Sequence, residues 1–462
     1  MAGQTLHVFH AEKRIGRLGY DPNEQVYSFE YAEAWQDDPT AFDLAPLLPR
    51  KDRLHSGSAV RFFFSNLLPE GEMLEIVART HGVSKYDPFG LLRKIGAECA
   101  GALSILESDT ARADGKTYAR IRNEELSARA RADAADLLAN AGGRLRMSLA
   151  GVQDKLPALV TSDGTVALPE PGSASAHILK PDNRQWRAYP HSAANEHFCM
   201  ELARRLGLDV PRSALMKVPE SIYVVERFDR VFEHPLEVAG KEGLLELQGA
   251  PVRRLHQIDV CQLLGIPPTQ KYEEPEFETP PGPNLPTIVE ALSGAVGDAL
   301  AVRQALIEWV IFNYLVGNSD SHSKNISMLW KDGRWRLAPT YDLLSVAVYS
   351  EDPEKLHDLA FTIGGETRYA WITGARWLEF SNDLGVGYRY VQRALLRLSS
   401  RVRSQAEALV KDLSSRLSIE ERGLIEKILA LIQVHAGYAE ESARTMPEAA
   451  RLAREGARKA QS

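Results

Sequence analysis

The segment that most constrains how this chain can fold is residues 317–345, "GNSDSHSKNISMLWKDGRWRLAPTYDLLS". It holds two aspartates, Asp320 and Asp342, and an asparagine, Asn325, five positions after the first of them. The apolar runs "ISMLW" and "WRLAP" flank an Asp-Gly dipeptide, which is a strong signal for a tight hairpin. Such a hairpin carries the chain out and back, so we expect Asp342 to return close to Asn325.

This spacing is typical of a phosphotransferase catalytic loop. Asp320 would receive the proton of the attacking hydroxyl, while Asn325 and Asp342 would hold Mg²⁺, which prefers hard oxygen ligands. An isolated Asp-x4-Asn also fits a capped turn after a helix, and the hairpin with Asp342 favours the metal site. His322 and Lys324 in the same loop fit either phosphate contacts or ordinary surface residues.

Two further segments contain residues that a kinase needs. "SASAHILKPD" places Lys180 at the end of an apolar strand, and Glu196 follows early in a helix, as in the lysine–glutamate pair that positions nucleotide phosphates. "SIYVVERFDR" runs from a strand into Glu226, Phe228 and Asp229, where a linker between lobes can offer backbone groups to adenine and a carboxylate to ribose. Ordinary strand ends with solvated charges fit both segments as well.

A Gly-x-Gly-x-x-Gly phosphate loop is missing from the sequence. In its place stands "GGRLRMSLAGVQDKLPALV", which is rich in small residues around Ser148 and Gly151. Such a loop can bring backbone N–H groups onto phosphate oxygens, and it equally fits a plain connection between strands.

The periodicity of apolar residues divides the chain into sheet-rich and helical parts. Alternation predicts strands within 6–32, with Tyr27, Phe29 and Tyr31 on one face and a turn at 21–23. We expect an α/β domain over 1–108, a linker and helix over 109–140 that Gly142 and Gly143 terminate, a sheet-rich lobe over 141–254 and a helical lobe over 255–462. The strands of the sheet-rich lobe are expected at 156–160, 165–168, 176–180 and 221–226.

Two helices stand out. One is expected to start near Ser192 as N-cap and to end before Gly207. The other, residues 298–316, is apolar nearly all round, which is typical of a helix buried in a large core.

Composition limits the class of protein. The chain has 462 residues, so two to three domains are expected, and its net charge of −7 makes any nucleic-acid contact local or indirect. Its three cysteines form no Cys-x-x-Cys pair, which argues against a disulfide framework or a zinc site and fits a reducing cytoplasm. We expect no signal peptide and no membrane span, and therefore a cytoplasmic location.

Taken in order, these segments resemble the HipA family, the serine/threonine kinase toxins of bacterial HipBA toxin–antitoxin pairs. The resemblance runs over nearly the whole chain. It rests on the motifs "SNLLPEGE", "DPFGLLRKIGAECAGALSIL", "MSLAGVQDK", "HILKP", "NEHFCMELARRLGLDVP", "VVERFDR", "RLHQIDVCQLLGIPPTQKYE", "GNSDSHSKN" and "LAPTYDLLS".

The resemblance implies a role for each matching residue. Asp320 corresponds to the catalytic aspartate, and Asn325 and Asp342 correspond to the Mg²⁺ ligands. The positions that match the family's ATP-binding residues are Lys180 on the phosphates, Glu226 and Phe228 on adenine through their backbone, Asp229 on ribose, and Ser148, Gly151, Gln153 and Lys155 in the phosphate-loop segment. Ser148 matches the serine that family members autophosphorylate, and a phosphate there would repel the ATP triphosphate.

The resemblance also implies fold and function: an α+β, two-lobed protein-kinase-like fold with an extra N-terminal α/β domain and an all-helical C-terminal lobe. The implied activity is ATP- and Mg²⁺-dependent phosphorylation of an aminoacyl-tRNA synthetase, glutamyl-tRNA synthetase in particular, which stops translation and growth. The implied partner is a HipB-like helix-turn-helix antitoxin, through which operator DNA is mainly contacted. Ser321 departs from the family's usual glycine, and it would strain the loop if that position needs a positive φ.

Two other functions remain open. A corepressor would keep the fold and mainly dock onto the antitoxin–operator complex, but its mark, degraded metal ligands, is not seen in this sequence. A metal-dependent phosphoesterase would use Asp320 and His322 as ligands, but it lacks the further His or Asp clusters of a two-metal site.

Overall fold

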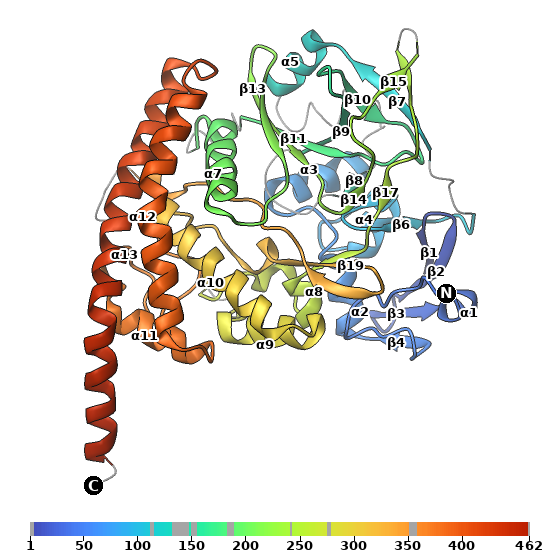
Figure 1. Cartoon of the computed structure of the whole chain (residues 1–462). Helices are drawn as coiled ribbons and strands as arrows, with labels where there is room; N and C mark the ends of the chain where they lie inside the picture. Colours follow the sequence, from blue (N-terminus) through green and yellow to red (C-terminus); the bar gives the residue numbers. More distant parts are fainter. Residues whose placement is uncertain are drawn as a thin grey trace. The chain divides into compact units, whose positions relative to one another are not determined.

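The chain forms two compact units, each assembled from segments far apart in the sequence (Figure 1). The computed structural model describes residues 4–110, 115–131, 147–148, 155–182, 189–240, 243–274, 279–350 and 358–460. The first unit comprises Met1–Gln185, Ala214–Pro268 and Ser327–Ala338. The second unit comprises Trp186–Ser213, Thr269–Ile326 and Pro339–Ser462.

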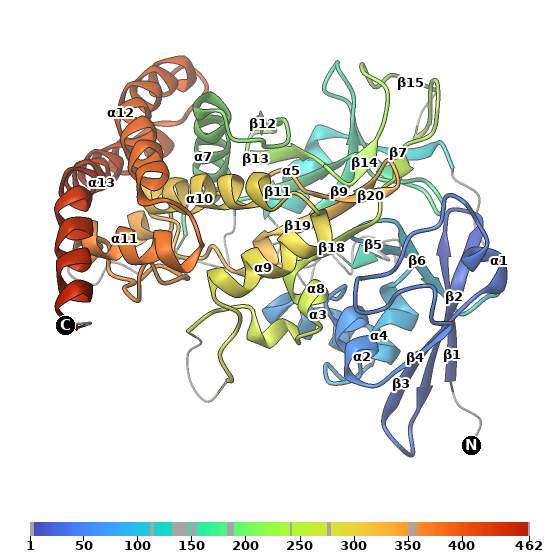
Figure 2. The ribbon, with the colours of Figure 1, turned by 60° about the horizontal axis from the view of Figure 1, so that its bottom comes forward.

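The first unit begins with a five-stranded antiparallel sheet in the order β4-β3-β2-β1-β6 (Figure 2). Its strands are β1 (Gln4–His10), β2 (Lys13–Asp21), β3 (Val26–Tyr31), β4 (Leu54–Ser56) and β6 (Leu103–Leu106). The helices of this segment are α1 (Glu33–Gln36), α2 (Ser58–Ser65), α3 (Gly71–His81) and α4 (Pro88–Ile95).

Alternation in β3 decides which face of this sheet is buried. Tyr27, Phe29 and Tyr31 are all buried, as the period of two predicts, while Ser28 and Glu30 between them are half-exposed. The predicted turn is formed as well, since the Asp21 carboxylate accepts the backbone N–H of Asn23 at 2.8 Å. The strands predicted within 6–32 are therefore confirmed.

The second sheet of this unit has eight strands in the order β12-β13-β11-β9-β10-β7-β16-β15. These are β7 (Thr117–Ile121), β9 (Leu156–Val160), β10 (Val166–Pro169), β11 (His177–Pro181), β12 (Ser213–Lys217), β13 (Ser221–Glu226), β15 (Val238–Ala239) and β16 (Leu244–Leu247). The four strands predicted for the sheet-rich lobe are confirmed within one residue. Helix α5 (Asn123–Arg131) lies in the predicted linker, whereas Gly142 and Gly143 fall outside the described residues.

Three smaller sheets complete the described strands of the first unit. β5 (Glu98–Cys99) pairs in parallel with β8 (Met147–Ser148), and β14 (Arg230–Val231) pairs with β17 (Arg253–Arg254). β18 (Gln257–Asp259) pairs with β19 (Ser327–Lys331), which forms a hairpin with β20 (Arg334–Leu337). Asp259 and Gln262 form a capping box that starts α8 (Val260–Leu264).

The described part of the second unit is helical, apart from Ser213 at the start of β12. Its helices are α7 (Ser192–Leu206), α9 (Leu285–Val296), α10 (Ala299–Val316), α11 (Gly374–Asp383), α12 (Tyr388–Leu413) and α13 (Ile419–Ala460). A sheet-rich unit and a helical unit confirm the α+β class. The two units do not follow the order of the chain. Helix α7 belongs to the helical unit although strands precede and follow it, and the β19–β20 hairpin belongs to the first unit although helices precede and follow it.

Helix α10 is the buried helix that the apolar run 298–316 predicts. Asp298 caps it by accepting the N–H of Ala301 at 3.0 Å, and Gly317 ends it in the left-handed conformation. Within the described ranges, α10 alone is long and apolar enough to match a membrane span by length and composition. Most of its residues are buried inside the protein, as in the core helix of a folded unit.

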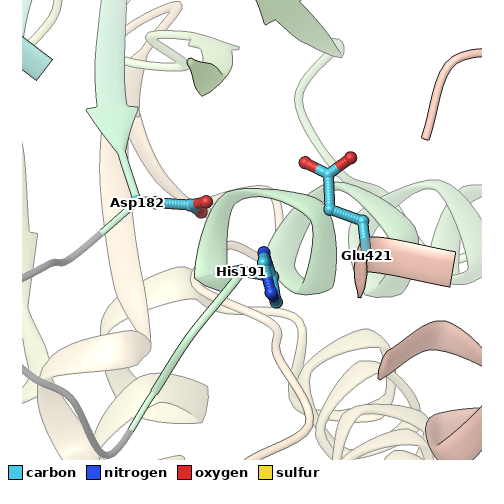
Figure 3. A group of neighbouring side chains, drawn as sticks. All are labelled: Asp182, His191 and Glu421. Carbon is cyan, nitrogen blue, oxygen red and sulfur yellow. The ribbon is translucent and has the colours of Figure 1, made fainter. Parts of the chain in front are cut away.

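Helix α7 starts one residue earlier than its capping pattern predicts. The N-cap is His191, with φ of 59°, and Ser192 is the first helical residue, so the prediction of Ser192 as N-cap is wrong. Figure 3 shows the His191 ring near the Glu421 carboxylate in the first turn of α13. A ring nitrogen of His191 lies within 4.8 Å of a carboxylate oxygen of Glu421. Glu421 also accepts the N–H of Ser418 at 2.7 Å, which closes the start of α13.

Candidate active site

The loop that carries Asp320 is built on the end of α10. Gly317 has φ of 70°, and a Cβ there would lie 2.9 Å from both Ala347 and Leu431, so no larger residue fits. Asn318 then donates to the Asn313 side chain at 2.7 Å and accepts the N–H of Asp320 at 3.2 Å. The buried helix thus fixes the backbone of the loop, while the Asp320 side chain stays exposed.

The hairpin returns Asp342 to Asn325, as the sequence predicts. Asp332 and Gly333 at its turn both have positive φ, at 54° and 74°, which matches the twist of a two-residue hairpin. The Asn325 amide nitrogen donates to Oδ2 of Asp342 at 2.9 Å, and its oxygen accepts the N–H of His322 at 2.9 Å. The predicted convergence of these two side chains is therefore confirmed.

Asp342 itself adopts an uncommon backbone conformation. Its φ is 61°, in the left-handed region that residues with a Cβ seldom occupy. Neighbouring bonds hold it there: the Tyr341 hydroxyl donates to the Lys324 carbonyl at 2.5 Å, and the N–H groups of Val346 and Ala347 both donate to the Gly317 carbonyl at 2.9 Å. Such an outlier, fixed by its surroundings, is typical of a functional site.

The donor set of this site suits Mg²⁺. A carboxylate and a carboxamide converge within hydrogen-bond distance, and the Asn325 amide oxygen has a second lone pair beside the one that accepts from His322. Hard oxygen donors of this kind are what Mg²⁺ takes from proteins, with phosphates and water completing its shell. Asn325 and Asp342 are thus the residues that could hold the ion.

Helix α7 is tied to the segment that follows Asp342. Asn195, whose side chain is fully buried, accepts the N–H of Ser345 at 2.8 Å and donates to the carbonyl of the same residue at 2.8 Å. It also donates to the Tyr349 hydroxyl at 3.1 Å. The next residue on α7, Glu196, is 2% exposed. Through the bonds of Asn195, the helix that carries Glu196 is fastened to the segment that follows Asp342.

Lys180 lies where the sequence predicts, on a strand of the first unit. It is the fourth residue of β11, faces Tyr223 of β13 in register, and holds its Nζ 5.9 Å from the ring centroid. Its side chain is 5% exposed, and a lysine is buried to this degree only with partners. Glu196 belongs to the second unit, and its pairing with Lys180 stays a prediction.

Glu226 and Phe228 mark the point where the chain leaves the sheet. Glu226 is the last residue of β13 and faces His177 of β11, and the N–H of Arg227 then donates to the Ala176 carbonyl at 2.8 Å. Glu226 and Phe228 are half-buried. Their backbone contacts to adenine stay a prediction.

Asp229 is a correction to the sequence analysis. Arg227 donates to both of its oxygens at 2.9 and 2.7 Å, the N–H of Gly101 donates at 2.7 Å, and a nitrogen of Arg230 lies 2.9 Å away. Burial alone would raise the pKa of Asp229, but the two arginines outweigh it and its pKa is lowered. This carboxylate is saturated inside the first unit, so a ribose contact does not fit the structure.

The same cluster includes a second carboxylate that the sequence analysis missed. Glu98 accepts from the N–H and hydroxyl of Ser175 and lies within 4 Å of both Arg227 and Arg230. The pKa of Arg230 is lowered to about 9, because burial and the Arg227 charge disfavour its protonated form. Two arginines around one aspartate in "ERFDR" are the signal that could have indicated an internal ion cluster.

The phosphate-loop segment is described only in part. The backbone of Ser148 lies in β8 and pairs with Cys99 of β5. Lys155 is half-buried just before β9. Gly151 and Gln153 fall outside the described residues, so their predicted roles stay predictions.

Ser321 does not strain the loop. The positive-φ residues of the described chain do not include it, and its hydroxyl donates to the Asn318 carbonyl at 3.2 Å. The glycine's conformational freedom is therefore not needed at this position. His322 and Lys324 are both buried, and the His322 ring meets the edge of Tyr272 with centroids 5.1 Å apart.

A catalytic-type aspartate on the loop after a buried helix, an amide–carboxylate pair across a hairpin, and a buried strand lysine are the parts of a protein-kinase-like phosphotransferase. The model of the HipA N-terminal domain matches residues 6–106, and that of the HipA-like C-terminal domain matches residues 147–413. The chain belongs to the HipA family and is a HipA-like serine/threonine-protein kinase toxin.

Similar proteins agree with this assignment. The chain is 34% identical to the putative kinase Y4mE of Sinorhizobium fredii, over 89% of this chain and 92% of that protein. It is 29% identical to the serine/threonine-protein kinase toxin HipA of Shewanella oneidensis, over 95% and 97% of the two chains. A solved complex of Shewanella oneidensis HipA, HipB and operator DNA contains a chain that matches with a TM-score of 0.79 and 26% identity, over 95% of this chain and 99% of that one. The kinase-like fold is confirmed.

Proposed function

We propose that the chain transfers the γ-phosphoryl group of ATP to a serine or threonine hydroxyl with Asp320 as the catalytic base and with Asn325 and Asp342 as Mg²⁺ ligands. The observation that carries this proposal is the 2.9 Å contact between the Asn325 amide and the Asp342 carboxylate, beside the loop of Asp320. Mg²⁺, when bound there, would offset the negative charge of the phosphates. Lys180 would contact the same phosphates from its strand, and the backbone of Glu226 and Phe228 would bind adenine.

The loop of Asp320 supports its role. Asn318 and the end of α10 fix its backbone, while the carboxylate stays accessible to a protein substrate. The hydroxyl oxygen would bond to the γ-phosphorus as its proton passes to Asp320, and the bond to the ADP oxygen would break. His322 and Lys324, on the same loop, would support the phosphates.

The proposal includes inactivation at Ser148. A phosphate there adds about 1.5 to 2 negative charges, which repel the ATP triphosphate from the segment that contains Gly151, Gln153 and Lys155. After incubation with MgATP, mass spectrometry is expected to find phosphate on Ser148 in the natural chain and none in Asp320→Asn. An unmodified Ser148 in a preparation that phosphorylates other proteins would remove this step.

In the cell, we propose that the kinase phosphorylates an aminoacyl-tRNA synthetase, glutamyl-tRNA synthetase first among them, and arrests growth. A HipB-like antitoxin would restrain it and would make most of the contacts to operator DNA; HipA of Shewanella oneidensis is found in a complex with HipB and operator DNA. An aminoacyl-tRNA synthetase as target places the proposed reaction in the cytoplasm.

Expression without the antitoxin is the test. The natural chain is expected to arrest growth, coexpression of the neighbouring helix-turn-helix protein to relieve it, and Asp320→Asn to be harmless. Phosphoproteomes of cells that make the natural chain or Asp320→Asn would identify the target. Harmless expression of a chain that is active in vitro would favour a corepressor.

A further inference from the structure

We infer that Tyr272 is a positioning residue for the catalytic base, an inference that rests on the proposed role of Asp320. The Tyr272 hydroxyl donates to Oδ1 of Asp320 at 2.5 Å. Tyr272 precedes Asp320 by 48 residues and comes from a segment without helix or strand. A hydrogen bond to a charged oxygen at this distance is among the stronger ones in proteins.

The backbone around Tyr272 is bound to the catalytic loop. The N–H and hydroxyl of Ser323 both donate to the Lys271 carbonyl, at 3.0 and 2.5 Å. The N–H of Gly282 donates to the Tyr272 carbonyl at 2.7 Å, and the Tyr272 ring packs edge-on against His322. The bonds to the Lys271 and Tyr272 carbonyls therefore fix the backbone that carries the hydroxyl.

The next residue fixes the segment from a second direction. The Glu273 carboxylate accepts the N–H of Thr362 at 2.7 Å and its hydroxyl at 2.9 Å. A Cβ at Gly282 would lie 2.2 Å from the Gln270 carbonyl oxygen and 2.5 Å from that of Tyr272, so the segment closes on a position that only glycine fits. These contacts restrict the backbone of Tyr272, as is needed if its hydroxyl is to orient the Asp320 carboxylate.

The consequence for Asp320 concerns its two oxygens. Tyr272 engages Oδ1, and within the described ranges no hydrogen bond reaches Oδ2. The carboxylate is thus held in one rotation, with Oδ2 left to accept the proton of the substrate hydroxyl. In this role the Tyr272 hydroxyl acts through Asp320 alone and needs no contact with ATP or substrate.

Tyr272→Phe tests this directly, because it removes the hydroxyl and keeps the ring against His322. The readout is ADP release from MgATP with water and the chain itself as acceptors, so no identified substrate is needed. We expect the rate at saturating ATP to fall about tenfold, a part of the roughly 10²–10⁴-fold that a general base supplies, and ATP affinity to stay unchanged. A structural defect would instead change affinity and rate together.

Tyr118→Phe is the matched control, since the Tyr118 hydroxyl donates to the Ala174 carbonyl at 2.9 Å within the first unit. It is expected to leave the rate unchanged. Thr362→Val, which removes one anchor of Glu273, is expected to lower the rate roughly twofold and serves if Tyr272→Phe does not fold.

An unchanged or faster Tyr272→Phe, beside an inactive Asp320→Asn, would overturn the inference and show that the hydroxyl merely covers the base. Full activity of Asp320→Asn would instead overturn the proposed function itself.

Discussion

Asp229 in the first unit and Asp320 in the second are two aspartates that the chain treats in opposite ways. Asp229 is 4% exposed, and two arginines and a backbone N–H satisfy it. Asp320 is exposed, and its side chain accepts one hydrogen bond, from the Tyr272 hydroxyl. A carboxylate that holds a fold is surrounded, whereas one that receives a proton from a substrate must keep an oxygen accessible.

The largest effect is expected from Asp320→Asn. Loss of the base should lower phosphoryl transfer by about 10²–10⁴-fold, while the free energy of unfolding stays the same because the side chain is exposed. Radiolabel transfer and urea unfolding measure the two quantities. Asp332→Asn is the control, since Asp332 is an exposed aspartate at the hairpin turn that forms an ion pair with half-buried Arg336 at 2.7 Å. Transfer retained by Asp320→Asn would contradict the comparison.

The reverse pattern is expected from Asp229→Ala. Removing this carboxylate leaves the buried Arg227 and Arg230 with the more distant Glu98 as their shared carboxylate, which costs about 3–5 kcal/mol of the free energy of unfolding. The protein that remains folded should bind ATP normally, because Asp229 faces Gly101 rather than a ligand. Urea unfolding and nucleotide titration check both statements. A loss of ATP affinity with normal stability would restore the ribose contact.

A smaller effect on stability, joined to an effect on rate, is expected from Asn195→Ala. It leaves the N–H and carbonyl of Ser345 unpaired in the interior, at a cost of about 2–3 kcal/mol. It should also lower the rate of ADP release, because the segment after Asp342 loses its anchor on α7. Asn66→Ala is the matched control: the Asn66 amide is buried and donates to two carbonyls of the first unit, at 2.9 Å each. Equal rates in both variants would contradict a coupling between α7 and Asp342.

The smallest effect concerns a buried group that stays neutral. Burial lowers the pKa of His256 to about 3, although its bond to the Leu44 carbonyl opposes the shift. The unfolded chain binds a proton at this histidine below about pH 6.5, whereas the folded chain does not. The free energy of unfolding therefore decreases as the pH is lowered from about 6.5 to 3, by about 1.4 kcal/mol per pH unit for this group. Urea unfolding at pH 7, 6 and 5 should show a shallower loss for His256→Gln. An identical slope would show that His256 is protonated in the fold.

Local patterns predicted most of the fold. The strands of the first sheet follow from alternation at Tyr27, Phe29 and Tyr31, and α10 follows from its apolar run, because both patterns record which side of an element is buried. The meeting of Asn325 and Asp342 could also be predicted, since a two-residue hairpin fixes the distance between its ends.

Contacts between distant segments could not be predicted this way. Asn195 reaches Ser345 across 150 positions, and Gly101 reaches Asp229 across 128. Arg227 and Arg230 beside Asp229 are a local sign of an ion cluster, but the partners that complete the cluster, Gly101 and Glu98, come from distant positions in the chain. The same holds for Tyr272, whose hydroxyl has no local signal of its target.

The amide of Asn195 engages Ser345 through both its donor and its acceptor, much as a neighbouring strand would. Glu196, beside Asn195 on α7, and Asp342, ahead of Ser345, are therefore expected to move together. Many kinases switch off by swinging the corresponding helix away from the nucleotide. Here that motion would also displace Asp342, the proposed magnesium ligand. We therefore expect inactivation at another place, and Ser148, the proposed autophosphorylation site, is the candidate.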